Sequence, residues 1–402
     1  MGLHCRSCKN THFSNVLSLG NLYLSEFTKG RKKPPRYPLN LVLCTDCFLV
    51  QLKETTPPKL LYTDNYGYKS GINLTMQQEL KDVVSKTLRK ITPKKNILSV
   101  DIGANDGTLL SNYSSSVKTI AFEPVAKLAK ECQKYADVVI NDFFNAKVLQ
   151  KKIGDKKTDI ITIISCFYDI PNPNQFLQDI TKILDENGIV VIQQNYLVGM
   201  LEQHAFDNIV HEHLEYYSML SLQTLLKRHD LEIFDVKLSD INGGSFRTYI
   251  NFSGKRKISK HVDTLLRKES ALKLNTRIPY KTFAKAIRKT KKQLFSFIQK
   301  EKRKGKSIAV YGASTRGNTL LQYFNLDNAL IDYAIERNPE KWGTNIASVG
   351  IPIISEDDAR KKHPDYMLVL PWFFKEEFLK REKAYLKTGG HFIFPLPTFE
   401  II

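Results

Sequence analysis

Residues 97–123 contain a pattern that could bind a nucleotide-like ligand. The apolar run 97–100 leads into D-I-G-A-N-D-G at 101–107, and a second apolar run ends at Glu123. A buried strand, a glycine turn and a helix bring the backbone close to a nucleotide-like ligand in doubly wound folds. A carboxylate about 20 residues after the turn can accept hydrogen bonds from both hydroxyl groups of a ribose. The pattern predicts a nucleoside site, with helix-like residues following the turn over 107–112.

His211, Glu212 and His213 form the second candidate site. They lie in the run F-D-N-I-V-H-E-H-L-E-Y-Y at 206–217, after the fifth predicted strand. Histidine titrates near neutral pH and can take a proton, and a neighbouring glutamate can orient it. A catalytic metal is disfavoured, because H-x-H supplies two ligands and the H-E-x-x-H spacing is absent. The segment therefore favours acid–base catalysis, and the alternative is a pair of structural histidines.

Four cysteines near the N-terminus form two C-x-x-C pairs. Cys5 and Cys8 are separated by 35 residues from Cys44 and Cys47. Four thiolates are the ligand set of a tetrahedral structural zinc site, and a metal suits a cytoplasmic chain better than two disulfides. The alternatives are a site that has lost its metal and a redox pair. The other two cysteines are isolated and are expected in the core or in a pocket wall.

The residues between these candidate sites alternate between apolar runs and helical patterns. This alternation predicts a parallel, doubly wound sheet, which binds ligands at the carboxyl ends of its strands. Strands are expected near 97–102, 118–122, 137–140, 159–164 and 189–194, and helices near 107–112, 124–135, 145–152 and 173–185. Asp142 lies at such a strand end. Together with the aromatic pair that follows it, Phe143 and Phe144, it could contact an adenine ring.

Two tyrosines precede this unit. Tyr66 and Tyr68 stand in a polar, glycine-containing segment before a predicted amphipathic helix at 73–91. In an extended segment, residues two apart point to the same side, so both rings could face one ligand. The alternative is two packed loop tyrosines.

A third unit follows the central one. A basic helical connector is expected over 255–304, and then G-A-S-T-R-G at 312–317 joins a strand to a helix. This turn could bind phosphate at a helix N-terminus with Arg316 nearby, or simply pack tightly. Apolar runs at 331–335, 366–370 and 391–394 complete a small α/β sheet.

Length and charge limit the possible classes of protein. At 402 residues, two or three domains are expected, and no apolar run approaches the length of a membrane span. The N-terminus lacks a signal-peptide core, so a cytoplasmic protein is the default. The net charge of +19 favours anionic partners. Nucleic acid is disfavoured, because the chain carries no recognition module, and the lysines of 255–306 fit a solvated helix surface.

In this order, the motifs resemble the sugar C-methyltransferases of deoxysugar biosynthesis. These S-adenosylmethionine-dependent enzymes methylate nucleotide-linked, typically dTDP-linked, ketosugars. The resemblance covers nearly the whole chain. The matching motifs are C-x-x-C at 5–8 and 44–47, Y-x-Y-x-S at 66–70, D-I-G-x-N-D-G at 101–107, F-E-P at 122–124, H-E-H-L-x-Y at 211–216, G-G-S-x-R at 243–247 and G-A-x-x-x-G-N-T-L-L at 312–321.

The resemblance implies an α/β protein with three parts. A small zinc-binding N-terminal domain is expected over 1–72. A central Rossmann-like class I methyltransferase domain is expected over 73–254, and a helical connector with a C-terminal Rossmann-like α/β domain over 255–402. S-adenosylmethionine and a structural zinc ion are the implied cofactors. The implied partner is a nucleotide-diphosphate sugar held between the last two domains, and the chain is expected to be a monomer or a small homo-oligomer.

The resemblance also assigns site residues. The expected catalytic residues are His213 as the base, Glu212 as its orienting partner, His211 as the second choice, and Tyr66 and Tyr68 over the donor or the sugar. The expected donor-binding residues are Asp101, Gly103, Asn105, Asp106, Gly107, Glu123, Pro124, Asp142, Phe143 and Ser165. The expected substrate-binding residues are Asn195, Tyr196, Tyr216, Arg247, Arg316 and Asn318. Cys5, Cys8, Cys44 and Cys47 would hold the zinc.

Three segments at the expected sugar pocket depart from the family pattern. The run 165–171 replaces an Asn-x-x-Ala-His-Ile-Pro pattern, Val210 replaces a tyrosine, and 193–196 replaces Glu-x-Pro-Tyr. The expected reaction is methylation of a carbon next to a ketone, which needs a base, a donor for the enolate oxygen and an aligned methyl group. The alternative is an N- or O-methyltransferase that acts on another small molecule or on RNA.

Overall fold

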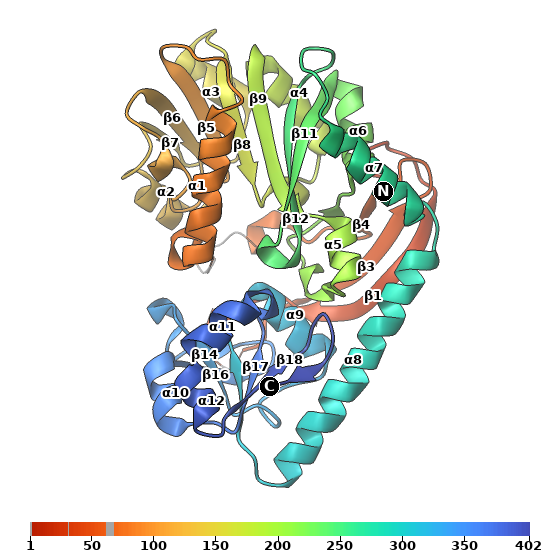
Figure 1. Ribbon diagram of the computed structural model, residues 1–402, viewed down its shortest axis with the longest axis vertical. Coiled ribbons are helices and arrows are strands. Elements are labelled where there is room, and N and C mark those ends of the chain that lie inside the picture. The colour runs from red at the N-terminus through yellow and green to blue at the C-terminus, as the bar shows by residue number, and fades with distance from the viewer. Residues whose placement is uncertain (1, 31, 62–67) are drawn as a thin grey trace.

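The strands of this protein form three sheets. The computed structural model describes residues 2–30, 32–61 and 68–402, and its sheets have four, seven and eight strands. Figure 1 shows the seven-stranded sheet in the upper half and the eight-stranded sheet in the lower half. The long strands β1 (Phe13–Tyr23) and β3 (Arg36–Cys44) curve beside them, and helix α8 (Ile278–Arg303) runs down the same side. The predicted α/β class is therefore confirmed.

The seven-stranded sheet is doubly wound, as predicted. Its order is β11-β12-β9-β8-β5-β6-β7. The strands β5 to β9 run parallel to one another, and β11 and β12 form an antiparallel edge. The strand order reverses between β5 and β8, which places the ligand-binding crevice at their carboxyl ends. The strands are β5 (Ile97–Ile102), β6 (Val117–Phe122), β7 (Val138–Ile140), β8 (Thr158–Ile164), β9 (Leu184–Asn195), β11 (Leu231–Ser239) and β12 (Ser245–Phe252).

Helices cover both faces of this sheet. On one face, α1 (Leu74–Leu88) packs Met76 and Leu80 against the strands, and on the other α4 (Pro173–Ile183) packs Leu177. Both helices begin at an asparagine whose side chain accepts hydrogen bonds from the first turn, since those N–H groups lack helical partners. The other helices are α2 (Ala126–Cys132), α3 (Ala146–Ile153), α5 (Leu197–Glu202) and α6 (Met219–Leu226).

The helix expected over 107–112 is wrong. This stretch forms turns and one 3-10 turn, Leu110–Asn112. Asn105 and Gly107 adopt φ angles of +54° and +83°, which are incompatible with a right-handed helix. The Asp106 carboxylate also accepts hydrogen bonds from the N–H and the hydroxyl of Thr108, so the local side chain replaces the helical pattern.

The four-stranded sheet joins the N-terminal region to the His-Glu-His segment (211–213). Its order is β1-β3-β4-β10, with β4 (Val50–Leu52) antiparallel to β10 (Glu215–Tyr216). The short strand β2 (Phe27–Thr28) instead pairs with β15 (Asn345–Ile346) of the lower sheet. Strand pairing therefore links the N-terminal region to both other parts, and the predicted domain limits stay a prediction.

The eight-stranded sheet has the order β19-β18-β17-β13-β14-β16-β15-β2. Its parallel centre starts with a strand, a glycine turn and a helix. Its further strands are β13 (Ile308–Tyr311), β14 (Tyr333–Glu336), β16 (Ile351–Ser355), β17 (Tyr366–Val369), β18 (His391–Phe394) and β19 (Glu400–Ile401). Its helices are α9 (Thr315–Tyr323), α10 (Glu356–Lys362), α11 (Lys375–Arg381) and α12 (Lys383–Lys387).

The basic connector is two helices rather than one. α7 (Lys260–Ala271) ends before Lys273, whose φ of +53° breaks the helix, and α8 begins with Pro279 in its first turn. Within the described part of the chain, no helix combines the length and apolarity that a membrane span requires.

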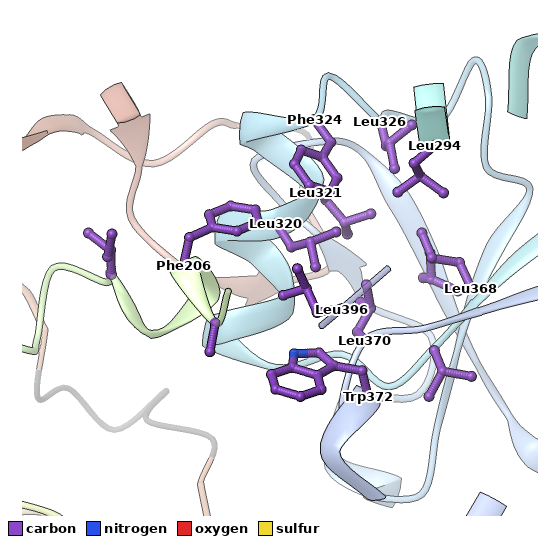
Figure 2. Close-up of a cluster of buried hydrophobic side chains, with 14 of the residues drawn as sticks. Phe206, Leu294, Leu320, Leu321, Phe324, Leu326, Leu368, Leu370, Trp372 and Leu396 are labelled. Carbon is purple, nitrogen blue, oxygen red and sulfur yellow. The ribbon is translucent and has the colours of Figure 1, made fainter. Parts of the chain in front are cut away.

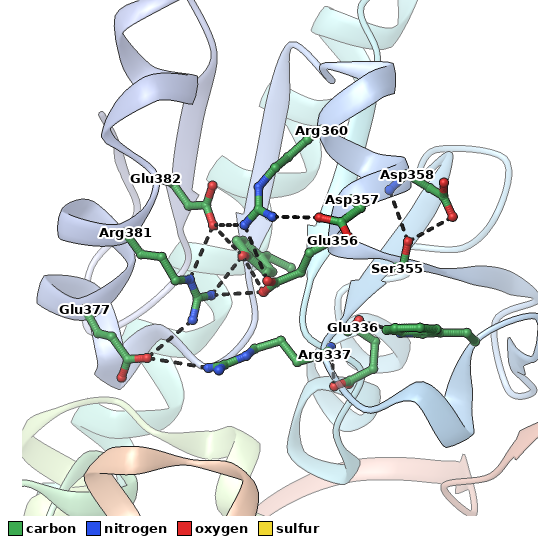
Figure 3. Close-up of polar contacts among 12 residues, drawn as sticks. Glu336, Arg337, Ser355, Glu356, Asp357, Asp358, Arg360, Glu377, Arg381 and Glu382 are labelled. Atoms are coloured by element: carbon green, nitrogen blue, oxygen red, sulfur yellow. Dashed lines mark hydrogen bonds and ion pairs between the residues drawn. The ribbon is translucent and has the colours of Figure 1, made fainter.

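Ion pairs fasten the helices of the C-terminal sheet to one another. The Tyr311 hydroxyl, at the end of β13, hydrogen-bonds Glu356 and Glu382 at 2.7 and 2.8 Å. Arg381 reaches the same hydroxyl at 2.8 Å, and Arg360 pairs with Glu382 at 3.1 Å. Figure 3 shows these side chains of α10 and α11 converging. The arginine and glutamate charges at this edge of the sheet therefore neutralise one another.

A hydrophobic contact joins the central and C-terminal sheets. Phe206 starts the run that leads to the His-Glu-His segment, and its fully buried ring packs on Phe324 at a centroid distance of 5.0 Å. Figure 2 shows Phe206 inserted beside Leu320 of α9, in the same cluster as Trp372 and Leu396. The start of the candidate catalytic segment is therefore anchored in the C-terminal core.

Replacing Phe206 by Ala should destabilise the protein by about 3–5 kcal/mol, because it removes a buried aromatic ring and leaves a cavity. Urea unfolding followed by circular dichroism measures this change. Leu238→Ala is the control, since Leu238 is 49% exposed and should cost much less. Equal losses in both variants would contradict the anchoring role.

Candidate active site

A cavity of about 490 Å³ lies at the carboxyl ends of the parallel strands. Its volume suits a nucleoside-sized ligand. Tyr68, Met76 and Leu80 close one side of it. The cavity is lined by eight of the predicted donor-binding residues, namely Asp101, Gly103, Asn105, Glu123, Pro124, Asp142, Phe143 and Ser165.

Glu123 connects the glycine loop to the next strand end. Its carboxylate oxygens accept the N–H groups of Asn105 and Val125, each at 2.8 Å. Burial raises the pKa of Glu123, and these two hydrogen bonds oppose the rise. A carboxylate oxygen can accept more than one hydrogen bond. Glu123 can therefore brace the loop and still accept ribose hydroxyls.

Asp101 and Gly103 form the floor of the cavity. The Asp101 carboxylate accepts the Thr162 hydroxyl at 2.6 Å, and burial raises the pKa of Asp101 to about 7. Gly103 has a φ of +72°, and a Cβ there would lie 2.9 Å from the sulfur of Cys166. Glycine therefore lets the strand turn against the neighbouring loop.

The side chains of Asn105 and Asp106 were expected to bind the methyl donor, but they form hydrogen bonds with the backbone of 68–71. Asn105 accepts the Ser70 N–H at 3.0 Å and donates to the Tyr68 carbonyl at 3.2 Å. Asp106 accepts the Gly71 N–H at 2.8 Å and does not line the cavity. Both residues fasten the segment 68–71 over the donor loop.

Gly107 also lies outside the cavity wall. A Cβ at Gly107 would meet Tyr135 at 2.9 Å, so this glycine is needed for packing.

The expected adenine side of the cavity is partly formed. Phe143 is 56% exposed and lines the cavity with Asp142. Phe144 instead packs edge-on against Phe122 and Phe176, each at 5.2 Å between ring centroids. Both rings of the aromatic pair line the cavity, and the neighbouring rings fix the orientation of Phe144.

His213 has one fixed tautomer. Its Nδ1–H donates to the carbonyl oxygen of Asn208 at 2.8 Å, which leaves the lone pair on Nε2. Burial, together with the positive charge of the nearby Arg316, lowers the pKa of His213 to about 3. The imidazole is therefore neutral at physiological pH, as a proton acceptor must be.

The expected roles of Glu212 and His211 need correction. The partner that orients His213 is the Asn208 carbonyl rather than Glu212. His211 donates its Nε2–H to the Tyr37 carbonyl of β3 at 3.1 Å and is 4% exposed, so this ring faces the N-terminal sheet. Burial raises the pKa of Glu212 to about 7. Tyr66 lies outside the described residues.

The loop after β8 lies between His213 and the donor cavity. The Tyr168 ring packs on the His213 ring at a centroid distance of 4.3 Å, and the next residue, Asp169, lines the donor cavity. A small second cavity beside His213 is lined by Tyr168, Asn195, Tyr196 and Tyr216. The structure therefore brings three of the predicted substrate residues next to the predicted base.

The polar ends of these three residues have protein partners. The Tyr196 hydroxyl donates to Glu269 at 2.8 Å, and the Tyr216 hydroxyl is 3.4 Å from the Asn208 carbonyl. Asn195 donates to the Asn208 side chain at 2.8 Å. In the described part of the chain, two side-chain atoms here are buried without a partner, namely Oδ1 of Asn195 and Nδ2 of Asn208.

Arg247, Arg316 and Asn318 are not at this cavity. Arg247 is fully buried and bonds Gln193 at 2.6 Å, Glu79 at 2.8 Å and Asp82 at 2.9 Å, so it ties α1 to the sheet. The Gln193 side chain is thereby engaged within the protein.

Arg316 lies at the contact between the central and C-terminal parts, and Asn318 is held within the C-terminal part. Arg316 donates to the Asp207 carboxylate through Nε and Nη2 at 3.0 and 2.8 Å. Asn318 is buried and accepts hydrogen bonds from Ser348 and Gln322. Both side chains are thus engaged within the protein.

Sequence reasoning missed the polar residues that precede the His-Glu-His segment. Asp207 also accepts the indole N–H of Trp372 at 3.2 Å, and Asn208 orients His213 through its backbone carbonyl. A main-chain carbonyl leaves no trace in residue type. The adjacency of Asp207 and Asn208 to the histidines was the only available signal.

The four N-terminal cysteines form a metal site. All four sulfur atoms lie within 4.8 Å of one another, and the pairs Cys5–Cys47 and Cys8–Cys44 are 3.5 Å apart. A tetrahedron with zinc–sulfur bonds of about 2.3 Å has edges of roughly 3.8 Å, so the cluster fits zinc. No position is left for a substrate, and the metal therefore has a structural role.

Comparisons with known proteins agree with this geometry. Three family models match in succession, described as "Putative zinc binding domain" over 5–62, "Methyltransferase domain" over 72–236 and "C-methyltransferase C-terminal domain" over 240–397. The C-methyltransferase NovU of Streptomyces niveus is 27% identical over 406 residues, which cover 99% of this chain and 96% of NovU. The chain belongs to the S-adenosylmethionine-dependent C-methyltransferases. The predicted cofactors, S-adenosylmethionine and structural zinc, are confirmed for this methyltransferase.

Two solved methyltransferase structures are similar to part of this chain at low sequence identity. An S-adenosylmethionine-dependent methyltransferase from Clostridium acetobutylicum is 13% identical, with a TM-score of 0.36 over 44% of this chain and 92% of that chain. The plantazolicin methyltransferase BpumL, solved with S-adenosylhomocysteine, is 13% identical, with a TM-score of 0.35 over 43% of this chain and 82% of that chain.

Glu123→Gln should weaken S-adenosylmethionine binding by about 1–3 kcal/mol, or roughly 5- to 150-fold. The amide NH₂ of Gln would face a backbone N–H that the carboxylate now accepts. Isothermal titration calorimetry measures the affinity. Glu186→Gln is the control, because the Glu186 side chain is 69% exposed. An unchanged affinity would restrict Glu123 to a structural role.

Cys8→Ser should abolish zinc binding and lower the melting temperature, because the binding energy of a structural metal is also folding energy. Metal analysis and thermal unfolding measure the two effects. Cys166→Ser, outside the cluster, should keep the zinc content of the wild type. Retained zinc in Cys8→Ser would contradict the four-thiolate site.

Proposed function

We propose that this methyltransferase acts on the carbon next to the ketone of a nucleotide-linked sugar, a deoxy-ketosugar of the dTDP-linked type. The observation that carries the proposal is the neutral His213, whose free Nε2 lies one loop away from the donor cavity. A base is required for this chemistry, because the C–H bond must break before the carbon can accept a methyl group. N- or O-methylation of a neutral nucleophile makes a weaker demand for such a residue.

The residues of this chain suit proton abstraction from carbon. His213 Nε2 would take the proton, and the electron pair of the C–H bond would move onto the carbonyl oxygen as an enolate. The Asn208 side chain supplies a buried amide N–H without a partner in the described chain, and a fixed N–H stabilises a developing oxyanion. S-adenosylmethionine supplies the methyl group when bound, as a sulfonium that needs no metal.

The residues around the donor suit orientation and exclusion of water. Glu123 would hold the ribose, and Tyr68 with Ser70 would cover the donor from the N-terminal side. Asn105 and Asp106 fix that cover by three hydrogen bonds to its backbone. An ordered cover keeps a reactive enolate away from water.

The high positive charge and the three-part architecture support an anionic, nucleotide-linked acceptor. NovU, a C-methyltransferase, matches along nearly the full length of the chain. The C-terminal domain would hold the nucleotide handle against the central domain. We place the reaction in the cytoplasm and expect a monomer or a small homo-oligomer.

The proposal is tested by incubating the protein with S-adenosylmethionine and a panel of nucleotide-linked 4-ketosugars in deuterated buffer. Mass spectrometry should find one added methyl group on carbon, with exchange of a carbon-bound proton. A methyl group on oxygen or nitrogen, or methylation of RNA alone, would instead establish the alternative acceptor class.

His213→Asn should reduce turnover by at least about 100-fold, because general-base catalysis contributes on that order. Its affinity for S-adenosylmethionine should stay near that of the wild type. His229→Asn is the matched control, since this half-exposed histidine contacts Asn174 away from the cavity. Turnover that survives in His213→Asn would remove His213 from the role of the base.

A further inference from the structure

Arg6 stands between the first two zinc ligands and is tied to the N-terminal sheet. It is 8% exposed. Its backbone N–H donates to the Gln51 side chain at 2.9 Å, and its Nη1 donates to the Leu52 carbonyl at 2.7 Å. Nη2 donates to the Thr55 hydroxyl at 2.7 Å. The direction of this guanidinium is therefore fixed by the residues that follow the second cysteine pair.

The same guanidinium faces the end of the His-Glu-His segment. Nε lies 3.5 Å from the Glu215 carboxylate, and Nη1 lies 3.5 Å from the Leu214 carbonyl. Glu215 is 1% exposed, and its oxygens have no hydrogen-bond partner among the described residues. Arg6 is thus the ion-pair partner that the structure gives to this buried carboxylate.

Leu214 connects this contact to the base. The Leu214 carbonyl accepts the Leu52 N–H at 2.8 Å, and the Leu214 N–H donates to the Tyr168 carbonyl at 2.8 Å. His213 is the preceding residue, and its ring packs on Tyr168. A shift of Leu214 would therefore move the His213 ring away from the Asn208 carbonyl that fixes its tautomer.

We propose that Arg6 is a positioning residue for His213. It transmits the rigidity of the zinc site to the base through Leu214 and Glu215, and it touches neither donor nor acceptor. This inference rests on the proposed role of His213. It assigns the zinc-bearing domain a part in the reaction beyond bracing its own fold.

The test is Arg6→Met, which keeps an apolar stem and removes the charge and the donors. Zinc content and the S-adenosylmethionine affinity, measured by calorimetry, should stay within about twofold of the wild type. Long-range ¹H–¹⁵N spectra at pH 7.5, with the His213 signal assigned by His213→Asn, should show the Nδ1–H form in the wild type. In Arg6→Met, a mixture of the Nδ1–H and Nε2–H forms is expected, because the His213 ring would lose its hydrogen bond to the Asn208 carbonyl.

Turnover is measured with a dTDP-linked 4-keto-6-deoxysugar. The kcat should fall by about 10- to 100-fold with little change in the KM for S-adenosylmethionine, because small misplacement of a reacting group costs this much. Arg6→Lys should recover part of the loss. Thr55→Val, which removes one anchor of Arg6 at an exposed position, should cause a smaller change in the same direction and covers the case in which Arg6→Met does not fold.

Lys53→Ala is the matched control, because Lys53 is an exposed cation on the same domain. A His213 signal of wild-type form in folded, zinc-loaded Arg6→Met would overturn the positioning role. The spectra need no substrate, so a failed panel of ketosugars would refute the proposed function without affecting this result. An altered His213 tautomer with unchanged kcat would keep the structural link and refute its catalytic consequence.

Discussion

The pairing of β10 with β4 is the constraint on which the rest of the site depends. Two residues after the base, the chain becomes a strand of the sheet that carries the zinc cysteines. The segment before it starts with Phe206 in the C-terminal core and passes through Asn208, whose carbonyl holds His213. The segment that carries His213 is therefore held at both ends by parts of the protein that lie outside the central sheet.

This arrangement explains why His213 needs no carboxylate partner. An imidazole beside a carboxylate tends to gain a proton, because the negative charge stabilises the cation. A neutral carbonyl fixes the tautomer without that effect, and burial and Arg316 both lower the pKa of His213. The cost is a weaker base, so the proposed reaction would depend on close positioning and on stabilisation of the enolate.

The sequence was sufficient for features that repeat along the chain or need particular residue types. The alternating apolar runs predicted the parallel strands, the thiolate pairs predicted the zinc site, and Glu123 followed from its distance to the glycine loop. The helix predicted over 107–112 does not form, because the backbone conformation at Asn105 and Gly107 overrides local propensity. Arg247 and Arg316 were misplaced because an arginine beside a glycine turn can serve an internal ion pair as readily as a ligand. The interactions that orient His213 involve main-chain atoms and residues far away in the sequence, and no local pattern encodes them.

The contact of Asp207 with Arg316 and Trp372 also links the C-terminal domain to His213. Asp207 is 1% exposed and accepts hydrogen bonds from both Arg316 and Trp372, so this carboxylate is held by two residues of the C-terminal domain. Its neighbour Asn208 orients the base, and Arg316 also acts on the pKa of His213. A movement of the C-terminal domain relative to the central one would therefore act on the base directly through the backbone of 206–208. In the proposed reaction, an acceptor that spans both domains would be sensed at His213, because the segment 206–208 contacts both the C-terminal domain and this imidazole.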